Sequence, residues 1–110
     1  MKKYQLGEFE EIVILTIGIL YREAYGVSIK KEIETRLSRN VSMGALHTSL
    51  KRLEDKGYIK SSLGGATKER GGRRKRIFTI TSAGMATLKA MREARIDLWK
   101  LVPQLKMIKG

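Results

Sequence analysis

The sequence contains no cysteine, one histidine and one proline among its 110 residues. The absence of cysteine excludes disulfides, thiolate metal ligands and a cysteine nucleophile. The single histidine excludes a zinc site built from several histidines. With no convergent carboxylates either, no acid–base constellation can be assembled from the sequence. We therefore expect a protein that is not an enzyme and that has no metal site and no cofactor.

Long apolar runs are also scarce. The longest run, residues 12–21, would span roughly 15 Å as a helix, about half of a bilayer core. Glutamates precede this run, whereas a signal peptide carries positive charge at that place. We expect a buried helix in a cytoplasmic protein without a membrane partner.

Negative charge is in short supply, and its distribution is uneven. Lysine and arginine number 23 against 11 acidic residues, which gives a formal net charge of +12. Residues 1–57 carry +2 of this charge and residues 58–110 carry +10. A local excess of this kind favours a polyanionic partner, and nucleic acid is the commonest one. The alternative is a solvated surface that keeps the protein soluble.

The hydrophobic periodicity predicts one domain of the mainly α (α+β) class. Three helices are expected, at about residues 7–21, after Gly26 and at 42–57. Two strands follow at 58–63 and 74–81, joined by a glycine-bearing loop, and a last helix runs from 82 to about 101. This order is that of a winged helix-turn-helix, with a two-stranded β wing and a long C-terminal dimerisation helix. Residues 1–81 would form the DNA-binding domain and residues 82–110 the dimerisation helix and tail, as one structural unit.

The third helix is the predicted reader of DNA. Leu46, Leu50 and Leu53 form a narrow apolar stripe, so the opposite face is small and polar at its start and basic further along. Ser42 is also a good N-cap, and His47 fits a half-buried polar position as well as a DNA contact. The predicted DNA-contacting residues of this helix are Ser42, Met43, Gly44, Ala45, His47, Thr48, Lys51 and Arg52.

The hairpin that follows is strongly basic, with the sequence KERGGRRKR at residues 68–76. Lysine and arginine supply most phosphate contacts in DNA binding, and glycines allow close approach to the backbone. The predicted DNA-contacting residues of the wing are Lys68, Arg70, Arg73, Arg74, Lys75 and Arg76.

The last helix carries more apolar surface than a small domain can bury alone. Its seam residues are 3 or 4 positions apart, which is a heptad pattern interrupted by Arg95. An isologous partner helix, packed with the unusually apolar first helix, would bury this surface. The predicted dimer-interface residues are Phe9, Leu88, Met91, Arg95, Leu98, Trp99, Val102 and Leu105.

The sequence resembles the PadR family of transcriptional regulators over nearly its whole length. Three segments carry the resemblance: YGVSIKKEI, SMGALHTSLKRLEDKGYI and GGRRKRIFTITSAG. The resemblance implies a homodimeric repressor that binds a palindromic operator in double-stranded DNA. The family usually has Tyr at the position of His47, often Pro at that of Thr48 and usually Tyr at that of Phe78.

The short C-terminal part is similar to the subfamily that ends in a single long helix. Some members of that subfamily bind flat aromatic drugs between tryptophans of the two subunits. Trp99 lies in this helix about one turn later than the family's drug-stacking tryptophan. This offset favours packing at the dimer interface, and contact with a small aromatic effector is the alternative role.

Two other functions fit part of the pattern. A winged helix can bind protein, in which case the basic wing would face an acidic partner. A basic nucleic-acid-binding protein without sequence specificity is the other alternative, although RNA recognition usually needs exposed aromatics that are scarce here. Specific binding of duplex DNA that weakens steeply with salt would separate these functions.

Overall fold

The computed structural model describes residues 6–64 and 75–104. Its elements, in chain order, are α1 (Glu8–Leu20), the short 3-10 helix η1 (Tyr21–Glu23), α2 (Gly26–Leu37), α3 (Met43–Asp55), β1 (Ile59–Leu63), β2 (Arg76–Ile80) and α4 (Ser82–Lys100). The predicted order of helices and strands is confirmed. The 3-10 helix was not predicted, because a three-residue turn has no periodicity to detect.

Helix α1 lies at the centre of the body and packs against α2, α3 and β2. Val13, Ile14 and Ile17 are fully or almost fully buried, because this helix is covered on several sides. Ile29, Ile33, Leu46 and Leu53 complete the core from α2 and α3. The helical bundle thus leaves one side of α3 free while burying its leucine stripe.

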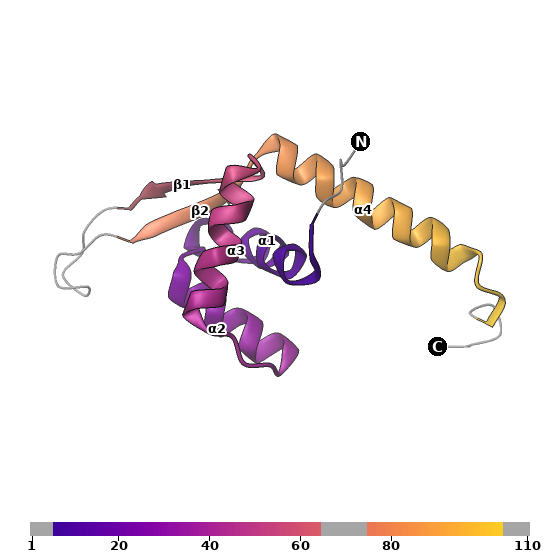
Figure 1. Ribbon diagram of the computed structural model, residues 1–110, viewed down its shortest axis with the longest axis horizontal. Helices are drawn as coiled ribbons and strands as arrows, with labels where there is room; N and C mark the ends of the chain where they lie inside the picture. Colours follow the sequence, from indigo (N-terminus) through magenta and orange to yellow (C-terminus); the bar gives the residue numbers. More distant parts are fainter. Residues whose placement is uncertain (1–5, 65–74, 105–110) are drawn as a thin grey trace.

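The two strands form an antiparallel hairpin in which Ile59 pairs with Ile80 and Leu63 with Arg76. Ile59 and Phe78 face the core, so the hairpin lies with one face against the helices. The Phe78 N–H also donates to the Ala24 carbonyl at 2.8 Å, which ties β2 to the segment before α2. Figure 1 shows the hairpin and α4 extending from opposite sides of the body.

The helix boundaries have local causes, and the N-cap at Ser42 is one that the sequence predicts. The hydroxyls of Ser42 and Thr81 accept from the N–H groups of Ala45 and Gly84 at the starts of α3 and α4. Gly57, with φ of +81°, follows the end of α3. Helix α4 ends before Pro103, since the residue before a proline disfavours the helical conformation.

Leu37 continues the four-residue spacing of the buried Ile29 and Ile33, but 48% of it is exposed. Helix α2 ends at Leu37, and Val41 from the following turn is buried in the core.

Candidate nucleic-acid interface

Helix α3 presents the outward face that the sequence predicts. Gly44, Ala45, Thr48, Lys51 and Arg52 are all exposed, whereas Leu46, Leu50 and Leu53 are buried. Small side chains at the start of the helix leave its backbone accessible, and the two cations follow about two turns along. This face can approach base edges closely and still reach phosphates.

Met43 and His47 lie beside the start of α2. A methyl group added at Gly26 would stand 3.3 Å from Met43 Cε and 3.8 Å from His47 Nε2. His47 is nevertheless exposed, whereas Met43 is half-buried and packs against the core. The histidine therefore lies beside α2 and is also exposed to solvent. This position fits both roles that the sequence leaves open, a polar packing residue and a DNA contact.

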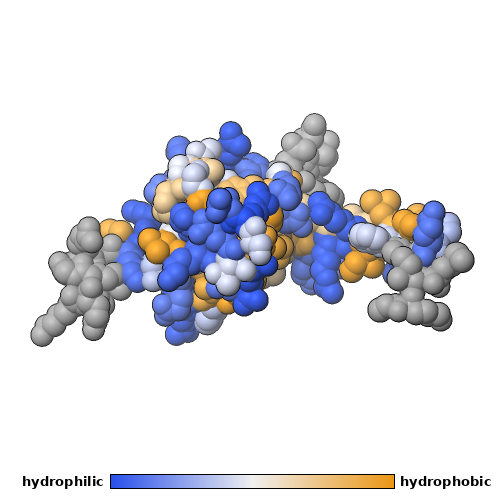
Figure 2. All heavy atoms as spheres, turned by 90° about the horizontal axis from the view of Figure 1, so that it is seen from below, coloured by the Kyte–Doolittle hydropathy of each residue, from blue (hydrophilic) through white to orange (hydrophobic). Residues whose placement is uncertain are grey.

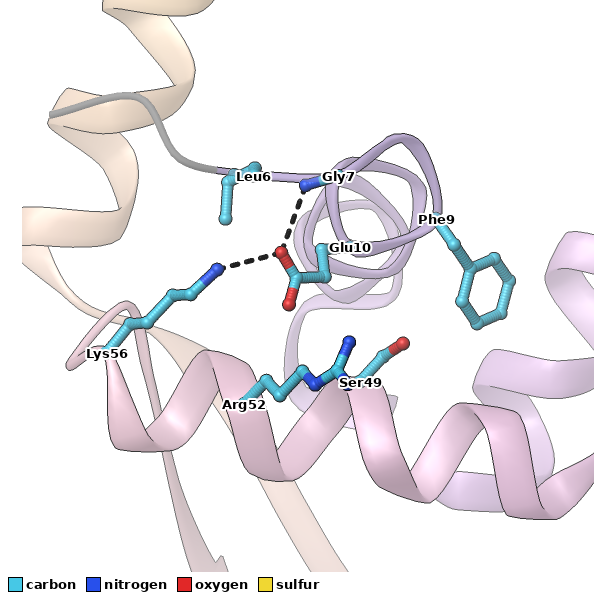
Figure 3. Close-up of a pocket in the computed structure, with 7 residues that line it drawn as sticks. All are labelled: Leu6, Gly7, Phe9, Glu10, Ser49, Arg52 and Lys56. Atoms are coloured by element: carbon cyan, nitrogen blue, oxygen red, sulfur yellow. Dashed lines mark hydrogen bonds and ion pairs between the residues drawn. The ribbon is translucent and has the colours of Figure 1, made fainter. Parts of the chain in front are cut away.

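The C-terminal end of α3 is joined to α1 by a buried carboxylate. Glu10 Oε1 accepts from Lys56 Nζ at 2.9 Å and from the Gly7 N–H at 3.0 Å (Figure 3). Burial by itself raises the pKa of Glu10, but the hydrogen bonds from Lys56 and Gly7 outweigh it and hold this pKa below its usual value. Glu10 is thus ionised at neutral pH, and its bond to Lys56, 46 positions away in sequence, links α1 to the end of α3.

A pocket of about 680 Å³ lies at this junction, lined by Leu6, Gly7, Phe9, Glu10, Ser49, Arg52 and Lys56. Phe9 points away from Glu10 in Figure 3, and the Arg39 guanidinium stacks over its ring at 5.4 Å. Phe9 packs against the chain's own core, so only part of its side chain remains exposed.

The described part of the wing has two cations that already contact their own chain. Lys75 Nζ lies 3.5 Å from the centre of the Tyr25 ring. Arg76 Nη1 donates to Ser61 Oγ at 2.9 Å, and Ser61 Oγ donates to Glu54 Oε2 at 2.9 Å. Lys75 therefore joins the base of the hairpin to the N-cap residue of α2, whereas Arg76 joins β2 to Ser61 of β1, and Ser61 is bonded to α3. Lys68, Arg70, Arg73 and Arg74 lie outside the described residues.

No local sequence pattern predicts these contacts, because Tyr25 is far from Lys75 along the chain and Glu54 and Ser61 are far from Arg76. The inward alternation of the strands is a signal that could have found part of them. Ser61 and Arg76 lie on the same face of the hairpin as Ile59 and Phe78, given the observed pairing.

Helix α4 divides into a buried first part and an exposed second part. Leu88 and Met91 are buried within the single chain, and Arg95 Nη2 lies 3.5 Å from Glu11 Oε1 of α1. Leu98, Trp99 and Val102 are exposed, and Leu105 lies outside the described residues. Of the predicted seam, the part from Leu98 onward is the one that remains uncovered.

A groove of about 650 Å³ separates α1 from α4. Its lining includes Glu11, Leu15, Gly18, Ile19, Ile80, Met85, Leu88, Lys89, Arg92, Arg95, Ile96 and Trp99. Figure 2 shows further apolar side chains gathered on the part of α4 that extends beyond the body. The groove floor is apolar, and cationic side chains of α4 line it as well.

Neither a membrane-spanning helix nor a metal-binding cluster is present within the described residues. None of the helices in residues 6–64 and 75–104 has the length and apolar composition needed to cross a bilayer. Within the same ranges, no group of three or more His, Cys, Asp or Glu side chains could hold a metal ion.

Comparisons with known proteins agree with this geometry. The model of the transcriptional regulator PadR-like family matches residues 14–90. A search of curated protein sequences gave no significant match.

Several solved structures share the fold. A PadR family transcription regulator from hypervirulent Clostridium difficile R20291 is 26% identical, with a TM-score of 0.67 over 88% of this chain and 97% of that one. A PadR-like transcription factor from Bacteroides fragilis is 20% identical, with a TM-score of 0.71 over 88% of each chain. Bacillus subtilis PadR in complex with operator DNA is 19% identical, with a TM-score of 0.60 over 76% of this chain and 46% of that one.

Proposed function

We propose that this chain, which belongs to the transcriptional regulator PadR-like family, is a homodimeric repressor that binds a palindromic operator in double-stranded DNA. Members of this family are transcription regulators and not enzymes. The observation that carries the proposal is the exposed, small and polar face of α3 beside a basic hairpin. The Bacillus subtilis relative, whose structure contains operator DNA, supports the same partner. We place the protein in the cytoplasm, where its operator would be.

In the proposed complex, α3 enters the major groove. Gly44 and Ala45 allow close approach, Thr48 and Lys51 face the bases, and Arg52 reaches a phosphate or a guanine. Ser42 and Met43 stand where the helix begins, and His47 lies at the edge of the reading face. The basic segment that joins the strands supplies Lys68, Arg70, Arg73 and Arg74 for the phosphates on either side.

The homodimer is supported by the uncovered part of α4. Leu98 is 65% exposed, Trp99 58% and Leu101 77%, and Trp99 also lines the apolar groove between α1 and α4. Exposed apolar surface of this extent on a small protein marks an interaction site. An isologous contact would bury it on both subunits at once and set two α3 helices about one DNA turn apart, roughly 34 Å.

We further propose that a small aromatic effector relieves repression by binding beside Trp99. A pocket of about 310 Å³ formed by Arg95, Leu98, Trp99 and Val102 supports this proposal, because an exposed indole offers a flat stacking surface. Quenching of the single tryptophan's fluorescence by flat aromatic compounds would test it directly. Absence of quenching by a broad panel would leave packing as the role of Trp99.

The experiment that tests the main proposal is selection of binding sites from random duplex DNA. We expect an inverted repeat, and we expect substitution of both Thr48 and Lys51 to change the selected bases more than the non-specific affinity. Each lost base contact should cost about 1–3 kcal/mol at one position of the site. Recovery of no preferred sequence would favour the non-specific binder. No affinity for DNA at low salt would favour a winged helix with an acidic protein partner.

A further inference from the structure

The turn between α2 and α3 is held by one carboxylate. Glu34, in the last part of α2, accepts at Oε2 from the Val41 N–H at 2.9 Å. Lys30 Nζ contacts the same oxygen at 2.8 Å from one turn earlier in α2. The bond to Val41 spans seven positions, and it reaches the residue immediately before the N-cap of α3.

This bond lies at the turn where the chain changes direction between α2 and α3. Ser38 ends α2 in the left-handed conformation, with φ of 50°, and four residues later Ser42 caps α3. The Val41 side chain is buried, so its N–H needs a partner from the protein. Glu34 supplies that partner, while the side chain of Val41 anchors the same residue in the core. The turn is thereby held by a backbone hydrogen bond to Glu34 and by burial of the Val41 side chain.

Charge strengthens this contact. The hydrogen bonds from Lys30 and from the Val41 N–H hold the pKa of Glu34 below its usual value, so the carboxylate is ionised at neutral pH. A hydrogen bond from an N–H to an ionised acceptor is stronger than one to a neutral acceptor. Lys30 helps to orient the carboxylate, and within the described residues it makes no hydrogen bond or ion pair with the turn itself.

We propose that Glu34 is a positioning residue for sequence recognition, which fixes the start of α3 relative to α2 without touching DNA itself. The proposal rests on the proposed role of α3 as the reader of the operator. Base contacts need side chains placed to within a fraction of an ångström, whereas phosphate contacts from long basic side chains tolerate more movement. Loss of the Glu34 bond should therefore lower operator affinity more than non-specific affinity.

The test compares four variants of the full chain. Glu34→Ala removes the acceptor, and Glu34→Asp keeps the charge but shortens its reach. Glu34→Gln keeps a neutral acceptor at full length, and Lys30→Met removes only the ion pair. Binding of the selected operator and of a scrambled duplex is measured for each at one salt concentration. Native-state amide exchange at Val41, measured without DNA, reports on the bond itself.

We expect Glu34→Ala and Glu34→Asp to weaken operator binding by about tenfold and scrambled-duplex binding by less than about twofold. Glu34→Gln and Lys30→Met should stay within about threefold of the wild type on both duplexes. The Val41 amide should exchange faster in the Ala and Asp variants than in the Gln variant. If Glu34→Ala does not fold, the contrast between Asp and Gln decides the question.

Two results would overturn the proposal. One is an equal loss on both duplexes in the Ala and Asp variants, which indicates a general loss of stability. The other is Val41 exchange that does not change in those variants, which removes the bond on which the proposal depends. Failure of the proposed function looks different, because the wild type itself would then show no preference between the two duplexes.

Discussion

The body of the molecule, formed by α1 to β2, buries a core of apolar side chains within the chain. The outer part of α4 leaves its apolar side chains exposed. In the body, Ile14, Ile29 and Leu46 are fully buried within one chain. In the outer part of α4, every described residue from position 92 onward is exposed, including Ile96, Trp99 and Leu101. The body thus contains a packed core of its own, whereas the outer part of α4 leaves its apolar surface uncovered in the single chain. Under the proposed function, DNA reading and association would therefore lie on separate parts of the chain.

The junction between the two parts is the place where a single change should have the largest effect. A methyl group at Gly84 would stand 2.1 Å from the Tyr58 carbonyl oxygen and 3.0 Å from Ile80 Cγ2. Neither the backbone of Tyr58 nor the packed start of α4 can easily move aside. Gly84→Ala should therefore lower the free energy of unfolding by about 3 kcal/mol or more, measured by chemical denaturation.

Gly44→Ala is the matched control for that change. Gly44 also lies in the first turn of a helix, but a methyl group there meets no atom within 4 Å. It should leave the free energy of unfolding unchanged or raise it by up to about 1 kcal/mol, since alanine favours the helix. Similar stability of the two variants would show that α4 does not start against Tyr58 as described.

The next effect concerns the outer part of α4 alone. Leu98→Asp places a charge in the exposed apolar surface without touching the core, since Leu98 is exposed. We expect the dimer dissociation constant to rise by at least about 100-fold, because an unpaired carboxylate would be desolvated in the interface. Sedimentation velocity at micromolar concentration measures this change, and circular dichroism should show an unchanged body.

Ser82→Asp is the control for Leu98→Asp, since it adds the same charge at an exposed position of α4 where the helix begins. It should leave the dimer intact, because a carboxylate is favourable at a helix N-terminus. A wild-type protein that sediments as a monomer would contradict the proposed role of α4, and so would a Leu98→Asp variant that remains a dimer.

A smaller effect is expected inside the body, at Glu10. Glu10→Gln removes the ion pair with Lys56 but keeps an acceptor for the Gly7 N–H. The free energy of unfolding at neutral pH should fall by about 1–2 kcal/mol. Glu8→Gln is the control, because Glu8 is exposed and lies 3.5 Å from its partner Arg39, and such pairs contribute little.

The pH dependence of this difference has a definite sign. The pKa of Glu10 is lower in the folded protein than its usual value of 4.5. The stabilisation by Glu10 is therefore fully present above pH 4.5 and is lost as the pH falls through the folded-state pKa. Denaturation curves at several pH values should show wild type and Glu10→Gln converging below pH 4.5, and a constant difference there would contradict the assignment.

The sequence predicts the body well because its elements are signalled locally. The caps at Ser42 and Thr81, the stop at Gly57 and the leucine stripe of α3 each depend on residues within one or two turns. The contacts of Glu10, Glu34 and Ser61 depend on how elements pack, which no local pattern reveals. Leu88 and Met91, which the heptad pattern predicts at a dimer interface, are buried within their own chain. A heptad pattern does not distinguish packing within one chain from packing against a partner.

The smallest expected effect concerns the wing, where the sequence predicts that Arg76 contacts phosphate. Its bond to Ser61 Oγ favours a different role, in which Arg76 joins the two strands and orients Ser61, which bonds Glu54 of α3. Arg76→Ala should then weaken DNA binding by only about threefold and leave the slope of log affinity against log salt unchanged. Ser61→Ala, which removes no charge, should have the same effect, and the double variant should bind DNA no more weakly than either single variant.

Arg74→Ala is the comparison, since loss of one phosphate contact should reduce the slope of log affinity against log salt by about 0.9. If Arg76→Ala reduces the slope by that amount and its effect adds to that of Ser61→Ala, then Arg76 contacts phosphate as its sequence position predicts.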